Sequence, residues 1–267
     1  MSKFLKKMLR LKQEEVSKGM QSLPYKELIK RIRTESSIPG GFLSALAGGG
    51  AVIAEVKYSS PSKGNFQITH SIKELVVQYQ NGGASAISVL TEPYYFNGSY
   101  EKLEMVRSST HLPILQKDFI IHPWQIYRGR AAGASAVLLI AALLEDGHLQ
   151  NLYHQAQQLG MDCLVEVHNG EELARLRRFS PKIIGVNNRN LNTLEVDLDT
   201  CMGLAQSLPK NALKIAESGI TSSQDVQKIA AAGYHGILVG EALVSSSSPG
   251  TMIKEYQRQF KKSGDPL

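Results

Sequence analysis

The chain has 267 residues, 42% hydrophobic and 20% charged, a composition typical of a globular protein. This length fits two small domains or one large α/β barrel. No apolar run approaches the ~20 residues of a membrane span, and no signal peptide is recognisable, so we expect a cytoplasmic protein. The two cysteines, Cys163 and Cys201, have no His or Cys at ligand spacing, which argues for reduced thiols and against a zinc site.

The N-terminal region is strongly basic. Residues 1–33 carry ten Lys and Arg against three Glu, a net charge of +7, whereas the other 234 residues sum to −1. A basic tail is compatible with nucleic acid or an anionic membrane. Apolar residues at helical spacing run through it, however, which favours docked amphipathic helices over residues 3–19 and 24–33 with a solvated basic face. We therefore expect an N-terminal helical extension over residues 1–45, with no nucleic-acid or membrane partner.

One pattern repeats over residues 51–260: a short apolar strand is followed by a helix. The predicted strands end near Lys57, Leu90, Lys117, Ile140, Val167, Asn187, Glu217 and Gly240. The predicted helices span residues 71–81, 99–108, 123–131, 145–159, 170–179, 197–207, 221–231 and 249–260.

Eight nearly continuous apolar strands alternating with eight helices indicate a closed parallel (β/α)8 barrel, a TIM barrel, within a single domain spanning residues 1–267. An open doubly wound sheet is the alternative. It would normally show a glycine-rich turn after its first strand, where this chain has Ser60-Pro61-Ser62 instead.

Polar side chains lie at the carboxyl ends of these strands, where barrels of this kind carry their function. Alternate residues of a strand point to the same face, so Lys117 shares the inward face of Leu115, and Glu166 shares that of Leu164. By the same argument six polar residues converge on one barrel mouth: Glu55, Lys57, Lys117, Glu166, Asn187 and Glu217. Charges are rarely buried without a purpose, so the group indicates a catalytic site rather than six separate strand-end salt bridges.

Two loops are candidates for binding phosphate. Ser218-Gly219 follows the seventh strand and Gly240-Glu241-Ala242 follows the eighth, and in many barrels these loops present backbone N–H groups to an anion. Glycine allows close approach of the backbone, although an ordinary turn would also use it. Lys57 is expected to add a positive charge near the bound phosphate.

The remaining candidates are less distinctive. Phe96, Phe119 and Leu139 fall near the mouth and form either an apolar wall for an aromatic ligand or ordinary core. His168 lies beside the proposed site, but no neighbour marks it as a base, and we expect it to be exposed.

Eight stretches of the sequence together resemble one known family. They are IAEVKYSSPSKG (53–64), TEPYYFNGSYE (91–101), LQKDFII (115–121), QIYRGRAAGASAVLLI (125–140), LVEVHN (164–169), GVNNRNL (185–191), AESGI (216–220) and LVGEAL (238–243). The set is similar to the indole-3-glycerol phosphate synthases of tryptophan biosynthesis over essentially the whole chain. Related phosphate-binding barrels share only the last two stretches, in looser form.

The resemblance implies a reaction and a set of roles. The substrate, 1-(2-carboxyphenylamino)-1-deoxyribulose 5-phosphate, cyclises and loses carbon dioxide and water, without a metal or organic cofactor. Lys117 is implied as the general acid and Glu166 as its partner in proton transfer, with Glu55 and Lys57 serving the later dehydration. Substrate orientation is implied for Ser60, Asn187, Arg189 and Glu217, and phosphate binding for Lys57, Ser218, Gly219, Gly240 and Glu241. A lysine at such a site can also have its pKa lowered toward the working pH.

Two other readings remain to be weighed against this one. Phosphoribosylanthranilate isomerase, a sibling barrel, uses a cysteine and an aspartate where this chain has Lys57 and Asn187, which argues against it. A catalytically silent barrel that binds an acidic partner through its basic N-terminus would not need the polar strand ends. We expect a monomer that acts on a phosphorylated small molecule, and association with other tryptophan-pathway enzymes stays open.

Overall fold

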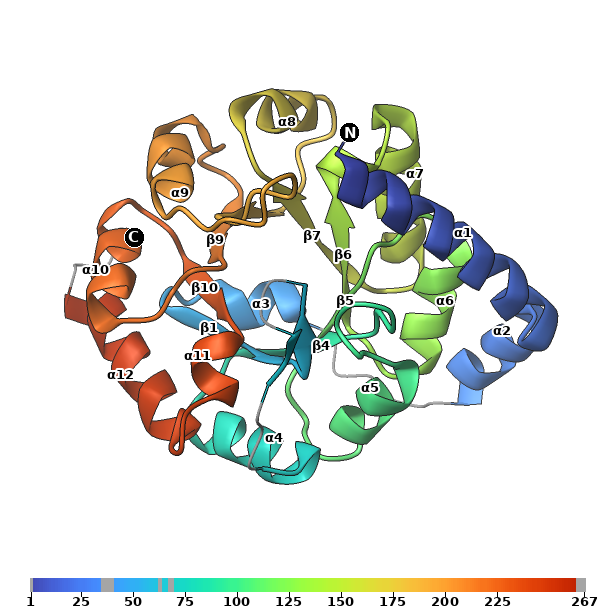
Figure 1. The fold of residues 1–267 in the computed structure, drawn as a ribbon, viewed down its shortest axis with the longest axis horizontal. Helices are drawn as coiled ribbons and strands as arrows, with labels where there is room; N and C mark the ends of the chain where they lie inside the picture. The colour runs from blue at the N-terminus through green and yellow to red at the C-terminus, as the bar shows by residue number, and fades with distance from the viewer. Residues whose placement is uncertain (1, 35–40, 62–63, 67–69, 263–267) are drawn as a thin grey trace.

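In the computed structural model, which describes residues 2–34, 41–61, 64–66 and 70–262, parallel strands form a closed barrel surrounded by helices (Figure 1). The described barrel strands are β1 (Ala51–Val56), β4 (Ala86–Leu90), β5 (Ile114–Lys117), β6 (Ala136–Ile140), β7 (Asp162–Val167), β8 (Ile183–Asn187), β9 (Leu213–Glu217) and β10 (Gly236–Val239). Strands consecutive in this order pair in parallel, and β1 closes the barrel against β10. The predicted (β/α)8 barrel is confirmed.

Apart from a short helix at residues 241–244, which the sequence does not predict, the surrounding helices lie where the sequence predicts them, within a few residues at each end. They are α4 (Ile72–Asn81), α5 (Tyr100–Arg107), α6 (Pro123–Ala131), α7 (Asp146–Gln158), α8 (Gly170–Arg175), α9 (Asp199–Leu204), α10 (Ser223–Ala231), α11 (Glu241–Val244) and α12 (Pro249–Lys262). Short 3₁₀ turns adjoin them at η1 (Ala141–Leu143), η2 (Leu176–Arg178) and η3 (Ala205–Ser207). A small hairpin of β2 (Ser59–Ser60) and β3 (Gly64–Asn65) follows β1, where the sequence predicts only a loop.

In the described part of the N-terminal region, three helices precede the first strand: α1 (Lys3–Ser22), α2 (Tyr25–Thr34) and α3 (Phe42–Leu46). They dock on the barrel through apolar contacts, as Val16 of α1 and Leu28 of α2 bury against Trp124 of α6. The indole N–H of Trp124 donates to the carbonyl of Leu23 at 2.9 Å, which fixes the turn between α1 and α2. In Figure 1, α1 and α2 lie against the α6 side of the barrel.

One basic residue of α1 is buried, although the sequence predicts that the basic face of this helix is solvated. Lys12 is completely buried, and its ammonium lies 2.6 Å from Asp118 Oδ1 and 2.9 Å from Glu15 Oε2. Asp118 directly follows Lys117 at the end of β5. The ion pair therefore fastens the N-terminal helix to a strand that ends at the barrel mouth.

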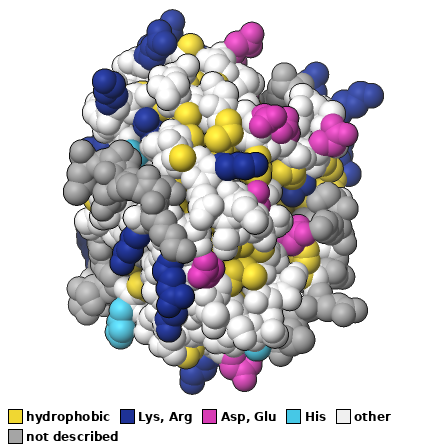
Figure 2. Space-filling model, turned by 90° about the vertical axis from the view of Figure 1, so that its left-hand side faces the viewer, with side chains coloured by type: hydrophobic (Ala, Val, Ile, Leu, Met, Phe, Trp, Pro, Cys, Tyr) yellow, Lys and Arg dark blue, Asp and Glu magenta, His cyan; other side chains and the backbone are white. Residues whose placement is uncertain are grey.

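One flank of the barrel has a surface of mixed charge. Figure 2 shows the flank on the left of Figure 1, where basic and acidic side chains are interspersed. Of the helices in the described ranges, none is long and apolar enough to cross a membrane.

Candidate active site

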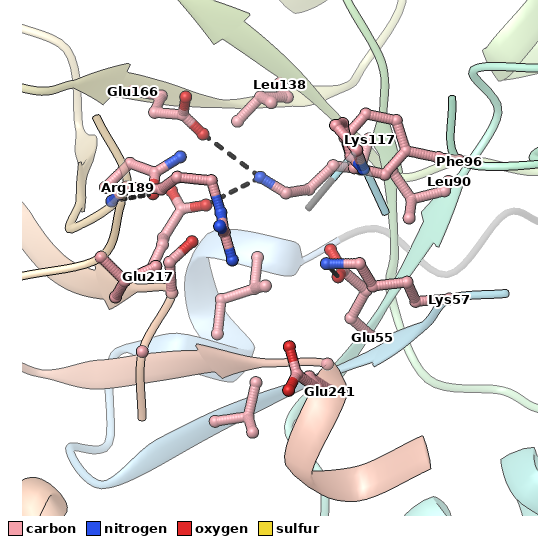
Figure 3. Close-up of a pocket in the computed structure, with 18 of the residues that line it drawn as sticks. Glu55, Lys57, Leu90, Phe96, Lys117, Leu138, Glu166, Arg189, Glu217 and Glu241 are labelled. Atoms are coloured by element: carbon pink, nitrogen blue, oxygen red, sulfur yellow. Dashed lines mark hydrogen bonds and ion pairs between the residues drawn. The ribbon is translucent and has the colours of Figure 1, made fainter. Parts of the chain in front are cut away.

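A cavity of about 470 Å³ opens at the carboxyl ends of the barrel strands. Much of its polar lining comes from β1, β5, β7, β8, β9 and the segments that follow them, and Glu92 after β4 and Glu241 after β10 add to it (Figure 3). All six residues predicted to converge line this cavity: Glu55, Lys57, Lys117, Glu166, Asn187 and Glu217. They meet because a parallel barrel brings the ends of its strands to one mouth.

Lys117 bridges two carboxylates inside the cavity. Its Nζ donates to Glu166 Oε2 at 3.2 Å and to Glu217 Oε2 at 2.9 Å (Figure 3). Space for Glu217 comes from Gly185 on the neighbouring strand, since a Cβ there would lie 2.1 Å from Glu217 Oε1. The lysine therefore has one defined position, held between carboxylates on two other strands.

The carboxylates decide the charge of Lys117. Burial alone lowers the pKa of the ammonium, but Glu217, Glu166 and then Glu55 outweigh it and raise that pKa above its ordinary value. The lowered pKa anticipated from sequence is therefore wrong for the free enzyme, because the neighbours are anions. Lys117 stays protonated throughout the ordinary working pH range.

The two partner glutamates differ in environment. Burial raises the pKa of Glu166, but Lys117 and His168 outweigh it and hold that pKa well below its usual range. Burial and repulsion by Glu166 raise the pKa of Glu217 to about 7. Among the described residues, nothing donates a hydrogen bond to Glu217 Oε1, which leaves room for a proton there. One carboxylate is fixed in its ionised form and the other titrates near neutrality.

Glu55 and Lys57 form a second pair on the β1 side of the cavity. Lys57 Nζ lies 3.6 Å from Glu55 Oε1 and 5.7 Å from the centre of the Phe96 ring. Glu55 lies against the last strand, since a Cβ on Gly240 would lie 2.5 Å from its Oε1. This pair is therefore close to the loop after β10.

Asn187 and Arg189 stand on the opposite side. Asn187 Oδ1 accepts the backbone N–H of Arg189 at 3.0 Å, and the guanidinium donates to the carbonyl of Leu194 at 2.7 Å. Both residues line the cavity. Ser60 belongs to β2, and its side chain lies outside the described part of the structure.

The two predicted phosphate loops meet at the same cavity. Ser218, Gly219, Gly240 and Glu241 all line it. Ser218 and Gly219 both have positive φ, 68° and 78°, and no described residue accepts a hydrogen bond from the Gly219 N–H. Asn188 fixes this turn by donating to the carbonyl of Ser218 at 3.0 Å. The turn therefore leaves a backbone donor free at the cavity edge, as an anion site requires.

The apolar wall is partly as predicted. Phe96 and Phe119 line the cavity with ring centres 6.4 Å apart, but Leu139 does not line it. Leu139 faces the other side of β6, and its neighbours Leu138 and Ile140 line the cavity instead. The prediction for Leu139 is wrong by one residue, which is enough to place a side chain on the opposite face of the strand.

Several residues at the site were not predicted, and three of them shape it directly. Phe4 of α1 lines the cavity and packs edge-on against Phe119, with ring centres 5.9 Å apart. Glu92 is buried and accepts the backbone N–H groups of residues 94–96, which shapes the loop that carries Phe96. His168, expected to be exposed, has only 10% of its side chain exposed and lies 3.2 Å from Glu166.

Comparisons with known proteins point to one family. A model of the family described as indole-3-glycerol phosphate synthase matches residues 5–256. A protein of Mycolicibacterium gilvum (strain PYR-GCK) named indole-3-glycerol phosphate synthase is 46% identical over 228 residues, covering 85% of this chain and 84% of that protein.

Solved structures show the same barrel at low identity. A 3-hexulose-6-phosphate synthase from Salmonella typhimurium superposes with a TM-score of 0.64 at 16% identity, covering 80% of this chain and 99% of that one. The alpha subunit of tryptophan synthase from Legionella pneumophila str. Paris gives 0.60 at 11% identity, covering 84% and 99%. These two likenesses concern the fold alone.

Proposed function

The chain belongs to the indole-3-glycerol phosphate synthase family, and on that premise we propose how its barrel mouth performs the family's reaction. The substrate is 1-(2-carboxyphenylamino)-1-deoxyribulose 5-phosphate, and the products are indole-3-glycerol phosphate, carbon dioxide and water. The observation that carries the proposal is Lys117, held between Glu166 and Glu217 at the floor of a largely apolar cavity.

Ring closure needs an electrophilic carbonyl and a dry slot for the aromatic ring. We place the ring against Phe96 and Phe119, and the carbonyl oxygen at Lys117. The ammonium donates its proton to that oxygen as the ring carbon attacks, and the carboxyl group of the ring leaves as carbon dioxide. Glu166, the ionised carboxylate beside Lys117, takes part in returning the proton.

Dehydration follows, and the second pair serves it. Loss of the hydroxyl requires a proton on the leaving oxygen and removal of a proton from the ring system. Lys57 and Glu55 lie 3.6 Å apart on the β1 side and supply one donor and one acceptor. Asn187, Arg189, Glu217 and Ser60 orient the substrate between the two pairs.

The phosphate is proposed to bind at the turns after β9 and β10. The backbone N–H groups of Ser218, Gly219, Gly240 and Glu241 are its donors, and Lys57 supplies the nearby charge. Glu241 contributes through its backbone, because a carboxylate side chain repels a phosphate.

A substitution in the first turn tests this assignment. Gly219→Val should raise KM by about ten-fold or more with a smaller effect on kcat, since 1.4 kcal/mol of binding is a factor of ten. The reason is steric as well as conformational: φ is 78°, and a Cβ would lie 2.3 Å from Val196 Cγ1. Competitive inhibition by inorganic phosphate should weaken in parallel. Gly203→Ala is the matched control, since a Cβ there meets no atom within 4 Å. Unchanged phosphate inhibition in the Gly219 variant would place the anion elsewhere.

Turnover should not depend on an added metal. Within the described residues no three His, Cys, Asp or Glu side chains are grouped as metal ligands require. Exhaustive dialysis against a chelator should therefore leave kcat unchanged. A loss of activity that a divalent ion restores would contradict this part of the proposal.

The N-terminal extension is proposed to act as one unit with the barrel, as a monomer. Phe4 in the cavity wall and the buried Lys12–Asp118 pair support the joining of the extension to the barrel. Cytoplasmic location, and association with other enzymes of the tryptophan pathway, belong to the same proposal.

A single assay tests the function as a whole. Purified protein is mixed with the carboxyphenylamino-deoxyribulose phosphate, and the rise of indole absorbance and fluorescence is followed. Release of one carbon dioxide per indole formed identifies the reaction. Absence of both products would overturn the proposal.

A further inference from the structure

His168 lies between two carboxylates just outside the reacting centre. Its Nε2 is 3.2 Å from Glu166 Oε1, and its Nδ1 is 3.0 Å from Glu172 Oε2. Glu166 is the last inward-facing residue of β7, and Glu172 lies in the first turn of α8. The imidazole therefore connects a buried carboxylate of the site with a partly exposed one behind it.

The two contacts determine the charge of the ring. A neutral imidazole carries one N–H and one lone pair, so one of its nitrogens would direct a lone pair at a carboxylate oxygen. A carboxylate oxygen lies within 3.2 Å of each nitrogen, so the two anions together favour the imidazolium. At Nδ1 the contact is a hydrogen bond, whereas at Nε2 it is an ion pair without hydrogen-bond geometry. Burial opposes this charge, but Glu166 and Glu172 outweigh it and raise the pKa of His168 to about 10.

Glu172 is itself fixed in place. Its Oε2 accepts the backbone N–H of His168 at 2.8 Å, and its Oε1 accepts the side-chain amide of Asn169 at 2.8 Å. Asn169 caps the helix by accepting the backbone N–H of Glu172 at 2.9 Å. The start of α8 therefore orients the carboxylate that holds the histidine.

On the other side, the oxygens of Glu166 are divided between two cations. Oε1 faces His168, and Oε2 accepts from Lys117. Glu217 and Glu166 repel each other when both are ionised, and Glu55 acts on the charge of Lys117. The groups form a row of alternating charge from the surface toward the barrel axis: Glu172, His168, Glu166, Lys117 and Glu217.

We propose that His168, held as an imidazolium by Glu172, is a positioning residue that keeps Glu166 ionised and aimed at Lys117 during the proposed reaction. This inference rests on the proposed function, in which Glu166 moves a proton. His168 contributes through Glu166 rather than by touching the substrate. Its position at one oxygen leaves the other oxygen for Lys117 and the reacting atoms.

The first test is His168→Gln, which removes the charge and keeps a side-chain amide. Loss of a cation within about 4–6 Å raises the pKa of a carboxylate by about 1–3 units. The acid limb of kcat/KM against pH, which reports ionisation of the free enzyme, should move to higher pH by about that amount. Well above that limb, kcat should recover to within about ten-fold of the parent and KM should change little.

Glu172→Gln should change the alkaline limb of the pH profile. Glutamine preserves the helix cap but removes the charge that stabilises the imidazolium, so His168 should deprotonate about one pH unit or more below its parent value. The fall in kcat that accompanies loss of the imidazolium, no more than about ten-fold, should then begin at a lower pH than in the parent. The double variant should follow the profile of His168→Gln, because Glu172 acts through the histidine. Glu171→Gln is the matched control: it removes the same charge from the same exposed turn without contacting His168, and should keep the parent profile.

A substrate-free measurement separates this inference from the reaction assignment. The ring C–H resonance of His168, assigned by its absence in His168→Gln, should titrate near pH 10 in the resting enzyme and lower in Glu172→Gln. A titration midpoint near 6.5, the unperturbed value, would overturn the inference even if turnover is as proposed. So would a folded His168→Gln variant whose acid limb does not move. If that variant does not fold, the inference is tested by the His168 titration and the pH profile of Glu172→Gln.

Discussion

Replacing Lys117 with alanine is expected to lower kcat by about 10²–10⁴-fold, the usual contribution of a positioned acid. KM should change far less, because the interaction with the carbonyl oxygen strengthens mainly in the transition state. The ammonium is fixed by Glu166 and Glu217 at 3.2 and 2.9 Å, so no neighbouring cation can take its place without moving. Steady-state kinetics on indole formation measure both constants.

Lys57→Ala is the informative comparison. Lys57 lies near the proposed phosphate site as well as Glu55, so this variant should lose substrate affinity together with rate. A Lys117→Ala protein that is folded by circular dichroism, yet turns over within a few-fold of the parent, would show that the assigned mechanism is wrong.

The stability of Lys117→Ala should depend on pH in a defined direction. Without the ammonium, Glu166 and Glu217 face each other, and the pKa of Glu217, already raised to about 7, should rise further. A carboxyl whose pKa is higher in the folded state favours folding below its unfolded pKa, and that contribution is lost as the pH rises through the folded value. The Tm deficit of the variant should therefore be larger near about pH 8 than near about pH 5.

Lys12→Met is expected to reduce the free energy of unfolding by about 3–5 kcal/mol, the cost of removing one partner of a buried ion pair. The residue left behind is Asp118, whose side chain is fully buried and lies 2.6 Å from the lysine. Thr91 and the backbone of Phe119 still donate to that carboxylate, but neither neutralises it. Because α1 also carries Phe4 into the cavity wall, KM should rise as well. Chemical denaturation and steady-state kinetics measure the two effects.

A surface lysine and a paired substitution control this result. Lys18→Met, at an exposed position of the same helix, should change stability by no more than about 0.5 kcal/mol. Lys12→Met combined with Asp118→Asn should recover much of the loss, since both charges are then gone. A Lys12 variant as stable as the Lys18 variant would mean that the pair does not hold the helix.

The strand ends and the inward charges could be predicted because two simple physical rules govern them. Strands buried on both faces are apolar runs, and parity then assigns Lys117, Glu166 and Glu217 to the cavity. Parity failed at Leu139 because the apolar run of β6 contains nothing that distinguishes its two faces, and Leu138 and Ile140 line the cavity instead.

The residues that sequence missed depend on partners brought together only by the fold. Lys12 resembles its exposed neighbours on α1, and only Asp118, more than a hundred positions later, buries it. His168 has its partners within four residues, but their contact requires the sharp passage from β7 into α8. The direction of the Lys117 pKa shift likewise follows from the two carboxylates that the barrel places against it.

Pairing of β1 with β10 has a consequence for how the protein is made. Ala51 pairs with Gly236, 185 positions away, so one edge of β1 has no partner until nearly the whole chain has left the ribosome. At about 5–20 residues per second, that apolar edge stays open for roughly 10–40 s of synthesis. Unpaired strand edges are templates for aggregation. Slowed translation or truncation between β1 and β10 should therefore lower the soluble yield more than any single substitution at the barrel mouth.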